Sequence, residues 1–187
     1  MFFVEDKDFL RDRDKDYIKN AILANFPFYL QNTTEGTDKN PHFSHILLRR
    51  EEERMPIDGT KRYPWNSDHG GWAKGILDRF CEKNNIKYDR ILRSVLNITF
   101  NTGIDENCPA HRDHEIPHKQ FILYLNDADP SAKTVFRDDD GHICKEITPE
   151  EHKGIMIDSG EHYYFFPKTG YRAVLVMTLV WVEVLEN

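Results

Sequence analysis

Two histidines and an aspartate are spaced in this chain so that they could hold a metal ion from one side. His111 and Asp113 are separated by a single residue, His162 follows in Gly160-Glu161-His162, and Arg172 stands ten residues beyond it. Two imidazoles and one carboxylate on one side of a metal leave its other coordination positions open to small molecules. Arg172 offers a planar, permanently charged guanidinium that suits a carboxylate. The pattern predicts an open metal site with an anion-binding arginine nearby.

Short strands are expected to position these residues. Side chains two apart on a strand point to the same face, so a strand would direct His111 and Asp113 to one side. The apolar run 121–126 is typical of the next strand, and Arg172 begins the most strand-like segment of the chain, which continues over 173–181. On the strand 121–126, alternation places Ile122, Tyr124 and Asn126 on one face.

These residues together resemble the Fe(II)/2-oxoglutarate-dependent dioxygenase superfamily, and within it most of all the prolyl-hydroxylase-like branch. The resemblance covers about half the chain, roughly residues 93–181. It rests on His111-x-Asp113, on Phe121-Ile122-Leu123-Tyr124-Leu125-Asn126, on Thr134-Val135-Phe136, and on His162 with Arg172 ten residues later. It implies a mainly β (α+β) fold, a double-stranded β-helix or jelly roll, supported by N-terminal helices.

The resemblance also implies roles for individual residues. His111, Asp113 and His162 would be the catalytic metal ligands and hold Fe(II), Arg172 would bind the distal carboxylate of 2-oxoglutarate, and Tyr124 would help to bind the same cosubstrate. The implied activity is that of an oxidoreductase, a dioxygenase that consumes 2-oxoglutarate and O2 and hydroxylates a prolyl or other amino-acid side chain. The sequence does not name the substrate, so small molecules and proteins both stay open.

The chain departs from the pattern of this branch in two places. Ser131-Ala132 stands where a glycine pair is usual, and the strand before the His-x-Asp motif, Asn97-Ile98-Thr99-Phe100-Asn101, lacks the tyrosine often found there. Thr99 or Asn101 could supply a hydroxyl or an amide to the cosubstrate instead. Either could equally be a polar strand residue that satisfies neighbouring backbone groups.

Two other functional classes fit the same three ligands. A zinc hydrolase or isomerase on a cupin-like barrel would use them with a metal-bound water as nucleophile or base, and would have no need of Arg172. A non-catalytic module with a metal site is the second alternative. Loss of 2-oxoglutarate binding in Arg172→Ala would support the oxygenase, whereas unchanged hydrolytic activity in that variant would favour zinc chemistry.

Length and composition favour one soluble domain over residues 1–187. We expect 1–90 to be helix-rich support with loops, and 91–187 to be a jelly-roll core that carries the metal site. Apolar residues make up 39% of the 187 and charged residues 30%, which suits a globular fold. The net charge of −7 disfavours a nucleic-acid partner, since such binders need clustered cations.

Cysteine usage and hydropathy bear on the compartment. Cys81, Cys108 and Cys144 lie far apart without a Cys-x-x-Cys spacing, so neither a disulfide framework nor a thiolate zinc site is expected. No apolar run approaches the roughly 18 residues that a membrane-spanning helix needs. We expect an intracellular, cytoplasmic protein without a membrane segment. The oligomeric state stays open.

Periodicity predicts two helices in the first half and strands in the second. The helices are expected over 8–24 and from an N-cap at Asp68 to a stop at Asn84-Asn85, with Trp72, Ile76, Leu77 and Phe80 packing on the core. Strands are expected at 28–30 and 46–48, and then in the series 93–100, 121–126, 133–137, 142–147, 154–158, 163–166 and 172–183.

Loops around the mouth of the barrel are expected to select the substrate, because binding residues often lie on loops over a rigid scaffold. The segments concerned are 31–44, 54–70 and 102–118. His114 and His118, in the last of these, could contact substrate or support the metal site. The histidines without a partner pattern are expected to be structural: His42, His45, His69, His142 and His152.

Overall fold

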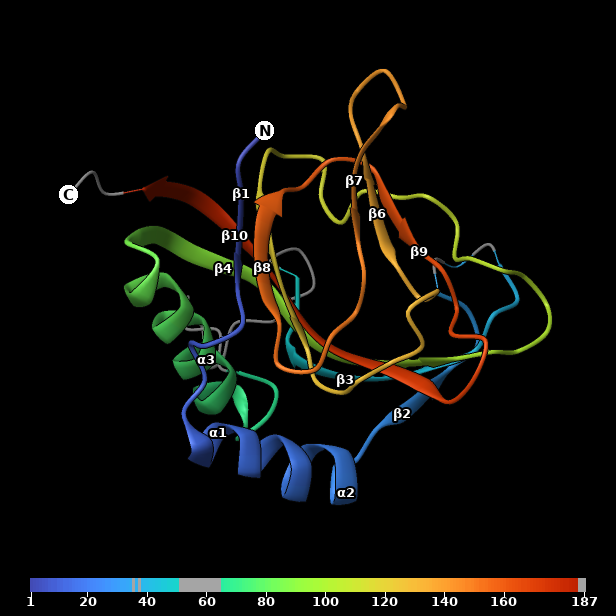
Figure 1. The fold of residues 1–187 in the computed structure, drawn as a ribbon, viewed down its shortest axis with the longest axis horizontal. Coiled ribbons are helices and arrows are strands. Elements are labelled where there is room, and N and C mark those ends of the chain that lie inside the picture. The colour runs from blue at the N-terminus through green and yellow to red at the C-terminus, as the bar shows by residue number, and fades with distance from the viewer. Residues whose placement is uncertain (35, 37, 51–64, 185–187) are drawn as a thin grey trace, which may run out of the picture.

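The computed structural model describes residues 1–34, 36, 38–50 and 65–184. Most of the predicted loop 54–70 therefore lies outside the described residues. Two antiparallel sheets dominate the described part of the chain (Figure 1). The larger sheet has the strand order β1-β8-β5-β10-β4-β3-β2, and the smaller has the order β7-β6-β9. The strands are β1 (Phe3–Asp6), β2 (Tyr29–Gln31), β3 (His42–Leu48), β4 (Ile86–Phe100), β5 (Lys119–Tyr124), β6 (Thr134–Arg137), β7 (Ile143–Ile147), β8 (Gly154–Asp158), β9 (His162–Tyr164) and β10 (Tyr171–Val184).

The helices lie on the outer face of the larger sheet (Figure 1). They are α1 (Asp12–Tyr17), a π-helical turn (Ile18–Ile22), α2 (Leu23–Asn25) and α3 (Gly70–Lys83). Phe80 of α3 and Phe9 contact Phe121 of β5 through their rings, in a core that also contains Ala173, Leu175, Met177 and Leu179 of β10. The predicted stripe of α3 is confirmed, since Ile76, Leu77 and Phe80 are fully buried.

Strand β10 is central because it pairs with β4 on one side and with β5 on the other. Four of its side chains enter the core under the helices: Ala173, Leu175, Met177 and Leu179. The alternate side chains therefore face the smaller sheet, and these are Arg172, Val174, Val176 and Thr178. The register aligns these inward-facing residues in rows across the three strands. Three of these rows are Thr99 with Arg172; Asn97, Val174 and Tyr124; and Arg93, Thr178 and Gln120.

A second apolar cluster joins the two sheets on this inner side. It contains Ile122 and Tyr124 of β5 together with Phe136 of β6 and Ile147 of β7. The inner faces of the two sheets therefore enclose the space between them, and the alternation predicted for 121–126 places Tyr124 inside it. The expected mainly β architecture with supporting helices is confirmed.

Several boundaries differ from those predicted. Strand β1 was not anticipated, β3 begins at His42 inside the predicted loop 31–44, and β4 begins at Ile86 rather than at 93. The cap of α3 is His69 and makes no side-chain hydrogen bond, so the prediction of Asp68 is wrong. The stop at Asn84-Asn85 is confirmed, with Asn85 at a φ of 54°.

Among the described residues, no helix combines the length and the apolarity that crossing a membrane requires.

Candidate metal centre

The three predicted ligands meet at one point between the sheets. One side-chain ligand atom from each of His111, Asp113 and His162 lies within 4.8 Å of the other two. The backbones of His111 and His162 exchange two hydrogen bonds of 2.9 Å, and this bridge brings the loop before β5 against the start of β9. Asp113 and His162 are both buried. The sequence pattern thus located a real cluster.

Both imidazoles present the same nitrogen to this point. His111 Nδ1 lies 3.0 Å from the carbonyl oxygen of Pro109, and His162 Nδ1 lies 3.2 Å from that of Gly160. A carbonyl can only accept, so each Nδ1 carries the proton and each Nε2 is left with a lone pair. Ligand histidines in metalloproteins are held in this way, with one ring nitrogen fixed by a hydrogen bond and the other free for the metal.

The electrostatics of the cluster favour ligands in their metal-binding protonation states. Burial alone would raise the pKa of Asp113, but His162 and the Arg93 guanidinium lower it to about 2. Burial lowers the pKa of His162 to about 4. At neutral pH the site therefore contains a carboxylate and an uncharged imidazole, which a divalent cation requires.

Two neighbours of Asp113 were not anticipated from the sequence. Gln120 donates from Nε2 to Asp113 Oδ2 over 2.8 Å, and Arg93 donates from Nη1 to Asp113 Oδ1 over 3.3 Å. Both come from the row that also holds Thr178. Arg50 approaches the same carboxylate, with Nη2 4.0 Å from Oδ1. The carboxylate is thereby fixed on both oxygens.

The triad lines a cavity of about 70 Å³ that reaches Arg172 at its other end. Arg172 is 3% exposed, and it donates from Nη2 to Thr134 Oγ1 over 2.8 Å. Its guanidinium lies 5.4 Å from the ring centre of Tyr124 and 4.8 Å from that of Tyr164. The hydroxyl of Tyr124 lies 2.9 Å from Thr134 Oγ1. Arg172 and Tyr124 are therefore part of one cluster, as the sequence led us to expect.

Strand register gives the separation between the triad and this cluster. On the smaller sheet, Phe136 pairs with His162 and Thr134 pairs with Tyr164. The two rows are two residues apart, which is about 7 Å along a strand. A five-carbon chain spans about 5 Å between its terminal carbons. The spacing of the two rows is therefore comparable to the length of a five-carbon dicarboxylate.

Thr99 lies opposite Arg172 in the register and lines the same cavity. Its hydroxyl donates to the carbonyl oxygen of Arg172 over 3.5 Å. Asn101, the other candidate, directly follows β4, is exposed and does not line this cavity. Several lining residues were not predicted: Thr34, His42, Arg93, Asn97, Gln120 and Thr134. His42 was expected to be structural, but it lies on the face of β3 that lines the cavity.

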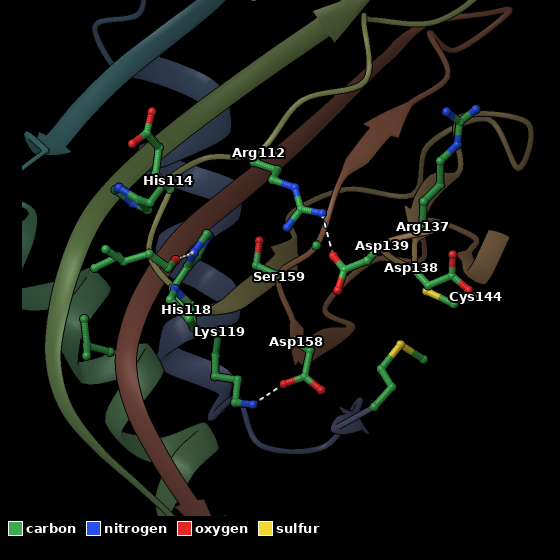
Figure 2. Close-up of a pocket in the computed structure, with 16 residues that line it drawn as sticks. Arg112, His114, His118, Lys119, Arg137, Asp138, Asp139, Cys144, Asp158 and Ser159 are labelled. Atoms are coloured by element: carbon green, nitrogen blue, oxygen red, sulfur yellow. Dashed lines mark hydrogen bonds and ion pairs between the residues drawn. The ribbon is translucent and has the colours of Figure 1, made fainter. Parts of the chain in front are cut away.

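A second and larger cavity, of about 730 Å³, lies at the end of the barrel where the segment 112–119 meets β8 and the β6–β7 hairpin (Figure 2). Charged pairs form its wall, with Arg112 donating to Asp139 over 2.8 Å and Lys119 to Asp158. His118 is 7% exposed, and its Nε2 has no hydrogen-bond partner in the described structure. His114 Nε2 lies 2.8 Å from Thr178 Oγ1. Both histidines line this cavity, and His114 also contacts the inward-facing Thr178 of β10.

No protein-family model and no curated protein matches this sequence. Solved structures do match. An oxidoreductase of the 2OG-Fe(II) oxygenase family from Burkholderia pseudomallei is 15% identical over 95% of this chain and 84% of its own, with a TM-score of 0.68.

Two prolyl hydroxylases are also similar. The enzyme from Trichoplax adhaerens, solved with a hypoxia inducible factor peptide, is 11% identical over 95% of this chain and 82% of its own, with a TM-score of 0.61. The prolyl-4-hydroxylase from Pseudomonas putida is 11% identical over 95% of this chain and 91% of its own, with a TM-score of 0.55. These likenesses confirm the expected fold: the chain has the double-stranded β-helix of the 2-oxoglutarate and Fe(II) oxygenases.

Proposed function

We propose that this protein is an Fe(II)- and 2-oxoglutarate-dependent dioxygenase that hydroxylates its substrate. The observation that carries the proposal is the buried Arg172. Its Nε has no hydrogen-bond partner among the described residues, and none of their carboxylates forms an ion pair with it. A buried charge is costly unless it is paired. An anion at the end of this cavity would supply the missing partner.

The residues present fit both iron and its cosubstrate. Iron would be held by His111 Nε2, His162 Nε2 and the carboxylate of Asp113, a donor set typical of non-heme Fe(II) sites. The distal carboxylate of 2-oxoglutarate would meet the guanidinium of Arg172 and the hydroxyls of Thr134 and Tyr124. Thr99 would support Arg172 through its backbone. When bound, iron and 2-oxoglutarate would supply the oxygen activation and the oxidative decarboxylation that drive hydroxylation.

The protein's own contribution would be orientation and exclusion of water. Arg172 would fix one end of the cosubstrate, so that its other end is directed at the metal position. Gln120 would hold the carboxylate of Asp113 in its ligand orientation. The apolar side chains of Ile122, Val174 and Val176 line the same cavity and would keep bulk water away from the reacting groups.

The substrate class is the finer part of the proposal. Prolyl hydroxylases are among the similar structures, and one of them holds a peptide. We infer a prolyl or another amino-acid side chain, in a protein or a small molecule, and no nucleic acid, because the net charge is −7. The large cavity beside His118 is the candidate entrance.

One dioxygenase domain over residues 1–187 is the organisation that we propose. Residues of the first half, among them Phe9, Ile18 and Phe80, share one apolar core with Leu175 and Met177 of β10. The first half also contributes β1, β2 and β3 to the larger sheet.

Anaerobic titration of the metal-free protein with Fe(II) and then 2-oxoglutarate tests the function. We expect a saturable visible charge-transfer band from the chelate, lost in His162→Ala and much weaker in Arg172→Ala. Tyr171→Ala is a matched control, because Tyr171 is the exposed neighbour of Arg172 on β10.

The alternatives give different results in the same experiment. A zinc hydrolase or isomerase would bind metal but give no band with 2-oxoglutarate, and its activity would not depend on Arg172. A non-catalytic metal module would also give no band and would turn over neither class of substrate. Either result with folded, metal-loaded protein would contradict the proposal.

A further inference from the structure

A second guanidinium faces the cavity at the end where the metal ligands lie. Arg93 projects from β4 into the cavity wall, and its Nη1 lies 3.3 Å from Asp113 Oδ1. Its row in the sheet contains Thr178 and Gln120, and Gln120 also contacts Asp113. Arg93 is therefore placed beside the position where a metal would sit.

Arg93 is too far from Arg172 for both to bind the same small dicarboxylate. In the register of β4 and β10, Arg93 pairs with Thr178 and Thr99 pairs with Arg172. Six residues separate the two rows, which is about 20 Å along the strand. The cosubstrate spans the interval between the triad and Arg172, so Arg93 stands on the other side of the metal position.

Most of the hydrogen-bonding capacity of Arg93 is unused among the described residues. A guanidinium has five N–H donors, and the one hydrogen bond found for Arg93 there is the bond from Nη1 to Asp113. Its side chain is 24% exposed, and that of neighbouring Arg50 is 31% exposed. An incoming molecule could thus reach both groups without displacing the core.

Once the proposed cofactors are included, the site carries more positive than negative charge. Fe(II) and the dianion of 2-oxoglutarate cancel, and Arg172 balances Asp113. Arg93 and Arg50, which both lie near Asp113, then give the site two positive charges in excess. A planar guanidinium binds a carboxylate through two parallel hydrogen bonds, so a carboxylate is the group that best satisfies the remaining donors.

We propose that Arg93, assisted by Arg50, binds a carboxylate of the substrate that is hydroxylated. This inference rests on the proposed function and narrows the class of substrate. The inferred substrate is a free amino acid, whose carboxylate meets the guanidinium of Arg93. The backbone of an internal residue in a protein chain would offer Arg93 only neutral amide groups.

Ligand-observed NMR with protein loaded with Zn(II) and 2-oxoglutarate tests this without turnover. The probes are the twenty free L-amino acids, each compared with its carboxamide. We expect at least one acid to bind, and its carboxamide to bind at least about tenfold more weakly, because a charge-assisted pair is lost. Arg93→Gln should lose the discrimination between acid and carboxamide, and Arg93→Lys should restore part of it.

Arg90→Gln is the matched control, since Arg90 is an exposed arginine of the same strand that lies near Asp89. It should leave both binding and discrimination unchanged. Zn(II) affinity and 2-oxoglutarate binding are measured for every variant. A variant Arg93→Gln that fails to hold the metal would mean that Arg93 only positions Asp113, which overturns the proposal.

The other outcomes also decide the question. The inference is wrong if no acid binds, if acid and carboxamide bind equally, or if Arg93→Gln keeps the discrimination between them. In each of these cases the proposed function still stands, provided that the protein binds 2-oxoglutarate. If the wild-type protein does not bind 2-oxoglutarate at all, the proposed function itself has failed.

Discussion

Gln120 holds Asp113 by a 2.8 Å hydrogen bond from its amide nitrogen, and both side chains are buried. This bond orients one carboxylate oxygen, so it determines where that oxygen meets a metal. Replacing Gln120 by Leu should reduce metal affinity by about 10- to 100-fold, the usual cost of losing such support. Competition with a chelator of known affinity measures the change.

The exposed Gln31 of β2 is a suitable control for this substitution, and Gln31→Leu should leave metal affinity unchanged. Thermal unfolding of both variants separates a local effect from a general loss of structure. Equal metal affinity in Gln120→Leu and wild type would mean that Asp113 needs no support from Gln120.

Acid should destabilise the metal-free protein, because folding keeps His162 unprotonated. Burial lowers the pKa of His162 to about 4, from an ordinary value of 6.5. Between these two values the unfolded chain binds more protons than the folded one, so the free energy of unfolding falls as the pH falls. We expect a loss of about 2 kcal/mol between pH 7 and pH 5 from this residue.

Denaturant unfolding at a series of pH values measures this loss. His162→Gln should have a flatter profile between pH 6.5 and 4, whereas His142→Gln, at an exposed turn, should follow the wild type. Burial also lowers the pKa of His42, so some slope should remain in His162→Gln. Identical slopes for wild type and His162→Gln would contradict the burial of a neutral imidazole.

The close packing of Gly154 in β8 gives a test of the helix-facing core. A Cβ at this position would lie 2.6 Å from Phe9 Cε1 and 3.0 Å from Phe80 Cδ2. Gly154→Ala should therefore destabilise the protein by about 1–3 kcal/mol through overpacking. At Gly71, in the first turn of α3, an added Cβ would meet nothing within 4 Å.

Gly71→Ala should be neutral or should stabilise by up to about 1 kcal/mol, since alanine favours the helix. Denaturant midpoints of the two variants check the pair. Similar midpoints for both would show that Phe9 and Phe80 move aside easily, and that the packing between α3 and the larger sheet is looser than the distances indicate.

The three candidate ligands could be predicted from the sequence because their spacing matches that of a known family. The strand expected to direct His111 and Asp113 is wrong, however, since both lie in the loop before β5, where the bridge between His111 and His162 holds them. Tyr124 and Arg172 were predicted in the same way, from alternation and from the family resemblance. In the structure Arg172 lines the cavity that the triad lines, and Tyr124 lies next to it, with its hydroxyl 2.9 Å from the cavity-lining Thr134.

Arg93 and Gln120 could not be predicted, because their importance depends on strand register. Arg93 becomes a neighbour of Asp113 only after β4 pairs with β10 at Thr178 and β10 pairs with β5 at Gln120. Nothing in the sequence around Arg93 specifies that alignment. The start of β4 was missed for a related reason, since Lys87, Asp89 and Arg90 are charged and project from the sheet into solvent.

The place of β10 in the larger sheet has a consequence for biosynthesis. Each of the other strands in that sheet precedes β10 in the chain, yet β4 and β5 meet only through it. While the ribosome is still making β10, β4 and β5 each present an unpaired edge, a form of nascent protein that is prone to wrong association. The three proposed metal ligands leave the ribosome before Arg172 does, so the proposed anion-binding end of the cavity is completed after the end that holds the triad.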